Sequence, residues 1–264
     1  MALPPVPLSI NSQQPIGMWR VVFTGPPAGG KSTALREICA RFTAAGFHVY
    51  IVPENATTIF KNIGGFDPEW VDQPEQIVVQ KILFEVQLAH EEATKDFARL
   101  RPMEPALILL DRGLQDGSGF CTSTQWTDIL QVVGTTKAVI LDRYDMVLDL
   151  QSVATFGAGE LYDFGVGSSN PERFHNRQQV LDLIPRSTEA YRGHPRLKHV
   201  KATEILADKM DCIFDAIMQA MPDTMVAAAR ARAPAVATAS VTDAVNVVED
   251  GNTLTATTSP MTSF

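Results

Sequence analysis

Short, mostly apolar runs recur along the chain and are separated by longer stretches of mixed character. The runs cover residues 19–24, 47–52, 106–110, 146–150 and 197–200. Apolar runs of this length, bounded by turn residues, are typical of strands that are buried on both faces of a parallel sheet. The pattern therefore predicts five strands.

The stretches between these runs place apolar residues at helical spacing. In residues 73–100, for example, Ile77, Val78, Ile82 and Val86 recur at the spacing of an amphipathic helix. Helices are also predicted at residues 31–45, 172–192 and 205–221. Residues 125–133 are predicted as a helix or a turn. Strands that alternate with helices predict an α/β fold, with a mostly parallel five-stranded sheet flanked by helices.

The two ends of the chain lack this pattern. Residues 1–17 contain four prolines and no apolar periodicity, which is typical of a flexible leader. Residues 223–264 are dominated by alanine, threonine, valine and serine, and such a segment buries too little apolar surface to fold. We expect one folded domain over residues 18–222, followed by a disordered tail.

The composition and charge of the chain argue against several kinds of function. A net charge of -8 argues against the broad basic surface that nucleic-acid binding needs. The three cysteines are far apart in the sequence, which favours neither a zinc site nor a disulfide framework. No apolar run approaches the roughly 20 residues of a transmembrane helix, and no secretory signal is visible. We expect a soluble, cytoplasmic protein without a transmembrane segment.

A phosphate-binding motif follows the first predicted strand. Residues 25–32 match the pattern G-x-x-x-x-G-K-[ST] between a strand and a helix, where backbone N–H groups and a helix N-terminus can surround phosphates. Lys31 would reach the β and γ phosphates, and Ser32 would supply a hydroxyl to Mg²⁺. A structural glycine turn would not need lysine followed by serine. The predicted nucleotide-binding residues are Gly25, Ala28, Gly29, Gly30, Lys31, Ser32 and Thr33.

Three further candidates follow other predicted strands. Asp111 lies at the carboxyl end of the third strand, where open α/β sheets bind ligands, and is expected to hold Mg²⁺ together with Ser32, or alternatively to cap the next turn from the surface. Arg112 would bind a phosphate, or else be a solvated or salt-bridged arginine. Glu54 follows the second strand and would act as a general base, or alternatively as a helix cap.

A charged segment near residue 172 completes the candidate catalytic set. Arg173 and Arg177 are four residues apart, so they would share one helical face. They are interpreted as part of a lid that brings arginines over the transferring phosphoryl group, although a solvated helix would show the same pattern.

Taken in order, these motifs resemble one known family, the P-loop domain shared by NadR and the TRPL translocation defect protein. The resemblance implies a P-loop NTPase of the kinase-like branch, near nucleoside and thymidylate kinases, with Glu54 and the Asp111–Arg112 pair at positions where those kinases carry functional residues. It also implies that residues 157–164 form the turn before the lid. The motifs are residues 25–32, 52–57, 110–113, Asp116, 143–145 and 192–195.

We therefore expect a phosphotransferase that uses ATP, or GTP, with Mg²⁺. Its acceptor would be a small hydroxylated molecule, with Glu54 as base and Lys31, Asp111, Arg112, Arg173 and Arg177 as the other catalytic residues. The absence of an N-K-x-D motif favours ATP only weakly. The alternative is a regulatory NTPase that hydrolyses slowly and signals to a protein partner. No nucleic-acid partner is expected.

Overall fold

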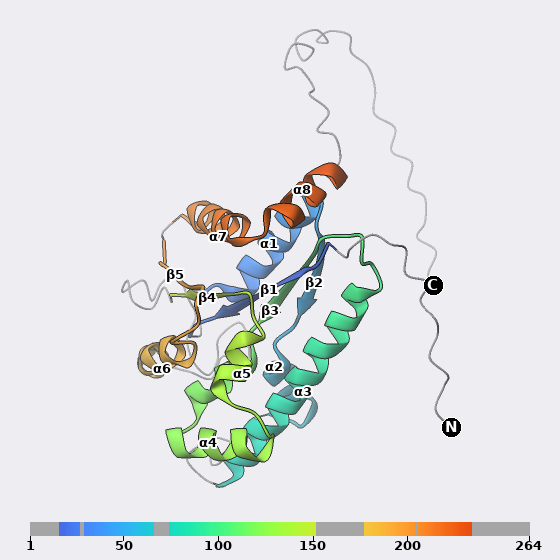
Figure 1. The fold of residues 1–264 in the computed structure, drawn as a ribbon. Helices are drawn as coiled ribbons and strands as arrows, with labels where there is room; N and C mark the ends of the chain where they lie inside the picture. Colours follow the sequence, from blue (N-terminus) through green and yellow to red (C-terminus); the bar gives the residue numbers. More distant parts are fainter. Residues whose placement is uncertain (1–15, 27–28, 66–73, 152–176, 204, 234–264) are drawn as a thin grey trace, which may run out of the picture. The chain divides into compact units, whose positions relative to one another are not determined.

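Five parallel strands form the sheet of this α/β fold (Figure 1). The computed structural model describes residues 16–26, 29–65, 74–151, 177–203 and 205–233. The strands lie in the order β2-β3-β1-β4-β5, and every neighbouring pair is parallel. They are β1 (Met18–Thr24), β2 (His48–Val52), β3 (Ala106–Asp111), β4 (Met146–Leu150) and β5 (Leu197–Val200). The predicted fold class and strand number are confirmed.

The helices follow the predicted pattern with additions. Thr122 and Thr136 begin two of them by accepting a hydrogen bond from a backbone N–H of the first turn, which satisfies a donor that the helix cannot. The helices are α1 (Lys31–Ala44), α2 (Asn55–Asn62), α3 (Pro74–Arg99), the 3₁₀ helix η2 (Leu114–Phe120), α4 (Ser123–Val132), α5 (Lys137–Asp142), α6 (Arg177–Ala190), α7 (Leu206–Ala220) and α8 (Asp223–Arg232). Among the described residues, no helix is long and apolar enough to cross a membrane.

Two apolar cores cover the two faces of the sheet. Along β1, Val21 and Phe23 pack into the core that includes α1, α7 and α8, whereas Val22 packs into the core that includes α3, α4 and α5. This alternation is the period of two that a strand imposes on its side chains. Because both faces are covered, the strands are apolar almost throughout, as the sequence indicated.

Helix α8 corrects the expected domain boundary. Residues 223–232 were predicted as the start of the disordered tail, but Met225 and Ala229 are buried against the sheet-covering helices. A Cβ on Gly46 would lie 2.0 Å from the Ala229 carbonyl oxygen, so the turn after α1 fits closely against α8. The prediction failed because small alanines give α8 little apolar periodicity. Residues 234–264 lie outside the described residues.

The sheet order brings the carboxyl ends of three strands together. β1 lies between β3 and β4, and Phe23 pairs with Asp111 while Val52 pairs with Leu110. The segments that follow β1, β2 and β3 therefore begin at one edge of the sheet. In open α/β sheets this edge, where the strand order reverses, is the usual place for ligands.

Candidate functional site

The glycine-rich loop after β1 lies directly against the end of β4. Gly25 has a φ of +124°, and Gly30, which precedes the first turn of α1, has a φ of +78°. A Cβ on Gly25 would lie 2.4 Å from the Leu150 carbonyl oxygen, and a Cβ on Gly29 would lie 2.7 Å from the same atom. Only glycine fits this approach, which forms the compact loop that phosphate cradling needs. Ala28 lies outside the described residues.

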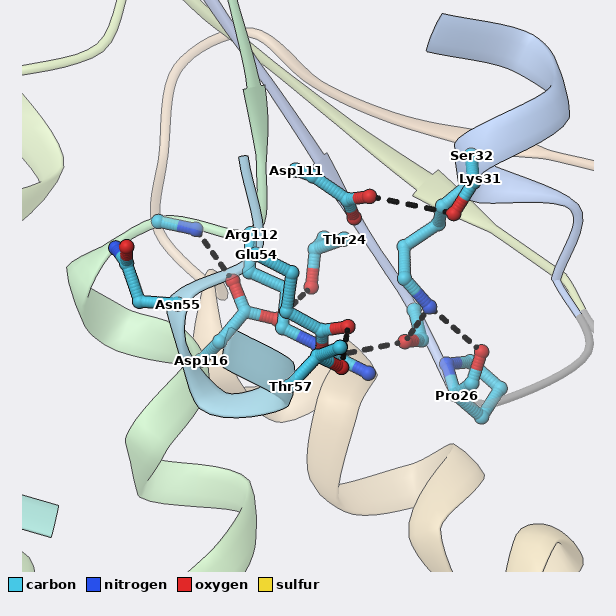
Figure 2. Close-up of polar contacts among 12 residues, drawn as sticks. Thr24, Pro26, Lys31, Ser32, Glu54, Asn55, Thr57, Asp111, Arg112 and Asp116 are labelled. Carbon is cyan, nitrogen blue, oxygen red and sulfur yellow. Dashed lines mark hydrogen bonds and ion pairs between the residues drawn. The ribbon is translucent and has the colours of Figure 1, made fainter. Parts of the chain in front are cut away.

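Lys31 is folded back over this loop (Figure 2). Its Nζ donates hydrogen bonds to the carbonyl oxygens of Gly25 and Pro26, both at 3.0 Å. Burial, reinforced by the nearby Arg112 guanidinium, lowers the pKa of Lys31 to about 8. Neutral carbonyls are weak partners for a buried ammonium. Glu54, Asp111 and Asp116 lie near enough to act on Lys31 by charge, but among the described residues its Nζ bonds only to carbonyls, and a phosphate would supply a direct anionic partner.

Ser32 and Asp111, which were predicted to bind Mg²⁺, lie next to each other. The Ser32 Oγ donates to Asp111 Oδ2 at 3.4 Å, and Asp111 Oδ1 is buried without a hydrogen-bond partner among the described residues. Burial is the main cause that raises the pKa of Asp111. A hydroxyl oxygen and an unpartnered carboxylate oxygen are ligands that Mg²⁺ accepts, with nucleotide phosphates and water completing its shell. The residues therefore fit this ion.

Arg112 has a strained backbone and strong ion pairs. Its φ is +70°, the only positive value at a non-glycine position among the described residues. Its Nε donates to Glu54 Oε1 at 2.6 Å, and its Nη1 donates to Asp116 Oδ1 at 3.1 Å and to the Gly25 carbonyl at 3.3 Å. Burial opposes the charge, yet the two carboxylates hold the pKa of Arg112 above its ordinary value. Such strain persists where surrounding bonds fix it, often at functional sites.

Glu54 lies at the N-cap position of α2 but does not act as a cap. Its side chain accepts no hydrogen bond from the first turn of backbone; Arg112 binds one oxygen, and the Thr57 hydroxyl donates to the other at 3.2 Å. Burial would raise the pKa of Glu54, but Arg112 and Lys31 outweigh it and lower the pKa. The carboxylate is therefore ionised at neutral pH.

Asp116 is a site residue to which the sequence assigned no role. Its carboxylate accepts hydrogen bonds from Thr24 Oγ1 (2.7 Å), the Gly113 N–H (2.9 Å) and Tyr191 OH (2.8 Å), besides Arg112. It thus ties the end of β1, the residue before η2 and the residue after α6 to the arginine. The spacing of four between Arg112 and Asp116 was the available signal, because it allows an ion pair within one turn.

A buried amide supports Arg112 from the side of α3. The Gln87 Nε2 donates to the Arg112 carbonyl and to Glu91 Oε1, both at 3.1 Å, while Asn55 Nδ2 donates to Gln87 Oε1 at 2.5 Å. Glu91 also accepts from Tyr144 OH at 2.9 Å. This network holds the strained peptide and connects it to α2.

A second lysine reaches the loop from α7. The Lys209 Nζ donates to the Gly29 carbonyl at 2.8 Å and to the Gln151 carbonyl at 3.4 Å. Burial lowers the pKa of Lys209 to about 8. The sequence prediction missed this residue, since Lys209 is 180 positions from Gly29 and belongs to no motif.

The structure describes only some of the other residues that the sequence predicted for the site. Thr33 lies in the first turn of α1. Arg177 begins α6, but its side chain, like Arg173 and residues 157–164, lies outside the described part of the chain. A lid that carries arginines therefore stays a prediction.

The chain was compared with models of known protein families and with curated proteins. A family model described as AAA domain matches residues 20–208. That span contains the loop, Glu54, Asp111 and Arg112. A P-loop domain of this kind indicates nucleotide binding, usually with Mg²⁺. No curated protein matches the chain significantly, so closer kinship with NadR or the TRPL translocation defect protein stays a prediction.

Proposed function

The chain belongs to the AAA domain family, and from that premise we propose that it transfers the γ-phosphoryl group of ATP, or GTP, to a small hydroxylated acceptor. Mg²⁺ would bind at Ser32 and Asp111 and neutralise charge on the phosphates. A cytoplasmic location, where ATP and Mg²⁺ are abundant, agrees with this activity.

One observation carries the proposal. The Gly25 carbonyl oxygen accepts hydrogen bonds from both Lys31 Nζ, at 3.0 Å, and Arg112 Nη1, at 3.3 Å. The buried Lys31 and the largely buried Arg112 therefore converge on one oxygen of the loop, and the ionised Glu54 lies next to Arg112. Cations that converge beside a carboxylate suit a reaction in which phosphate charge must be stabilised and a hydroxyl proton removed.

Each residue then has a distinct role. The loop N–H groups and Lys31 bind the β and γ phosphates, and Arg112 stabilises charge on the transferring group. The acceptor hydroxyl oxygen attacks the γ phosphorus, the bond to the β–γ bridging oxygen breaks, and the hydroxyl proton moves to Glu54. For this, the Glu54 carboxylate exchanges part of its 2.6 Å contact with Arg112 for the acceptor.

The same ion pair favours the alternative function. A carboxylate already bound by Arg112 would orient a water only occasionally, as in a regulatory NTPase that hydrolyses slowly and signals to a protein partner. Such a protein would need no acceptor pocket.

Nucleotide turnover with and without acceptors separates the two functions. We expect MgATP hydrolysis to be slow alone and to rise strongly with one compound of a panel of nucleosides and sugars, with a phosphorylated product detected by mass spectrometry. Uniform slow hydrolysis with every compound would contradict phosphotransfer and favour the regulatory NTPase. Lys31→Ala serves as the inactive control.

A further inference from the structure

The two residues that flank the peptide between Gly29 and Gly30 do little to fix its orientation. Neither residue has a Cβ, and Gly30 adopts a φ of +78°, so rotation of this peptide meets little steric resistance. No described residue accepts a hydrogen bond from the Gly30 N–H. The loop itself therefore does little to fix the direction of this N–H group.

Lys209 holds the other side of this peptide. Its Nζ donates to the Gly29 carbonyl at 2.8 Å and to the Gln151 carbonyl at 3.4 Å, which connects the loop to the residue after β4. In a planar trans peptide, the C=O and N–H groups point in opposite directions. When Lys209 holds the Gly29 oxygen toward α7, the Gly30 N–H must point away from it.

Fold stability gives no reason for a lysine here. The Lys209 side chain is 5% exposed, and no ion pair with a carboxylate is present among the described residues. Burial without an opposite charge is unfavourable, consistent with the lowered pKa of Lys209.

We propose that Lys209 is a positioning residue for nucleotide binding, which directs the Gly30 N–H toward the phosphates by holding the Gly29 carbonyl on the opposite side. This rests on the proposed nucleotide binding. Lys209 differs from Lys31, whose ammonium is expected to leave the Gly25 and Pro26 carbonyls and bind phosphate directly. Lys209 keeps its carbonyl partners in the free and in the bound protein.

The test compares Lys209→Met with the parent and with Lys137→Met. Lys137 is a matched control because its Nζ also donates to a carbonyl, that of Glu189 at 3.2 Å, far from the loop in the sequence. MgADP affinity is measured by calorimetry, and thermal unfolding is measured without nucleotide. We expect about tenfold weaker MgADP binding in Lys209→Met, an unfolding temperature within about 2 °C of the parent or higher, and no change in Lys137→Met.

Nuclear magnetic resonance can observe the Gly29–Gly30 peptide directly. Glycine labelled with ¹³C at the carbonyl and ¹⁵N at the amide selects peptide bonds between consecutive glycines, which occur only at 29–30 and 64–65. We expect Lys209→Met to shift the Gly30 amide signal and to leave the Gly65 signal in place. Lys209→Arg, which keeps a cationic donor, is expected to retain affinity within about threefold of the parent.

The outcomes are separable. Unchanged affinity and an unchanged Gly30 signal in Lys209→Met would overturn the proposal, as would an equal loss in the Met and Arg variants with both proteins folded. A lower unfolding temperature with parent-like affinity would show that the lysine only stabilises the fold. If the parent binds neither MgADP nor MgATP, the proposed function itself fails.

Discussion

Lys31, which is buried, and Arg112, which is largely buried, both donate to the Gly25 carbonyl oxygen, yet their surroundings shift their pKa values in opposite directions. Lys31 is bonded to carbonyls, and its pKa is lowered to about 8. Arg112 is bonded to Glu54 and Asp116, and its pKa is raised. Among the described residues, Lys31 has no carboxylate as a direct hydrogen-bond partner, whereas Arg112 has two. We therefore expect an incoming phosphate to bind at Lys31 before it contacts Arg112.

The largest expected effect tests the carboxylate side. Glu54→Gln keeps the shape of the side chain but cannot accept a proton, so we expect phosphoryl transfer to slow by roughly 10²- to 10⁴-fold with MgATP affinity close to that of the parent. Single-turnover kinetics and calorimetry on one preparation give both quantities. The control is Glu92→Gln, which changes a carboxylate of α3 that pairs with Arg143. Unchanged transfer in Glu54→Gln would rule out its role as base.

The second effect compares the two cations by stability. Arg112→Met leaves Glu54 and Asp116 without their guanidinium, and we expect it to lower the free energy of unfolding by about 3–5 kcal/mol. Lys31→Met removes a charge that has only carbonyl partners and is expected to change that free energy by about 1 kcal/mol or less, or to raise it. Urea unfolding measures both. Equal losses would mean that the two environments do not differ as described.

The third effect tests nucleotide affinity. Lys31→Ala removes the ammonium that the phosphates need, and we expect about 100-fold weaker MgATP binding in calorimetry with a parent-like unfolding temperature. Lys81→Ala, which breaks the exposed pair with Glu85 on α3, should bind like the parent. Parent-like affinity in Lys31→Ala would remove the basis of the phosphate-site assignment.

The smallest effect comes from pH. Phosphate favours the charged form of Lys31, so affinity is complete below its pKa of about 8 and decreases as pH rises through that value. We expect about tenfold weaker MgADP binding at pH 9 than at pH 7.

The free energy of unfolding changes with pH in the opposite sense to the affinity. It rises between pH 8 and 10.5, because in that range the unfolded chain binds the Lys31 proton more tightly than the folded chain. The rise in unfolding free energy with pH should therefore be smaller in Lys31→Met, where Lys209 still contributes.

Local pattern was sufficient for most of the fold and for one half of the site. The strand before the loop and the helix after it have strong periodicity, so the position of Lys31 and Ser32 followed from adjacent residues. Glu54, Asp111 and Arg112 were found because the carboxyl ends of parallel strands lie at one edge. The structure brings all five together, although their catalytic roles stay predictions.

The rest depends on contacts that sequence patterns do not contain. Lys209 lies among apolar positions of α7, where a charged residue ordinarily indicates the solvent face, and only packing against the loop shows its bonds. The carboxylate of Asp116 is identified by its partners Thr24, at the end of β1, and Tyr191, which follows α6. Helix α8 was missed because its buried surface comes largely from one methionine and small alanines.

The position of β1 has a consequence for how the chain folds during synthesis. Both neighbours of β1 come later in the chain, since Met18 pairs with Ala106 and Val21 pairs with Met146. A nascent chain that ends before residue 106 thus exposes an apolar strand with no partner, a species that chaperones recognise. Long-range parallel pairing also makes folding slow. The loop that follows β1 gains its binding geometry only when β4 has emerged from the ribosome, so nucleotide can stabilise this protein late in its synthesis and not at the start.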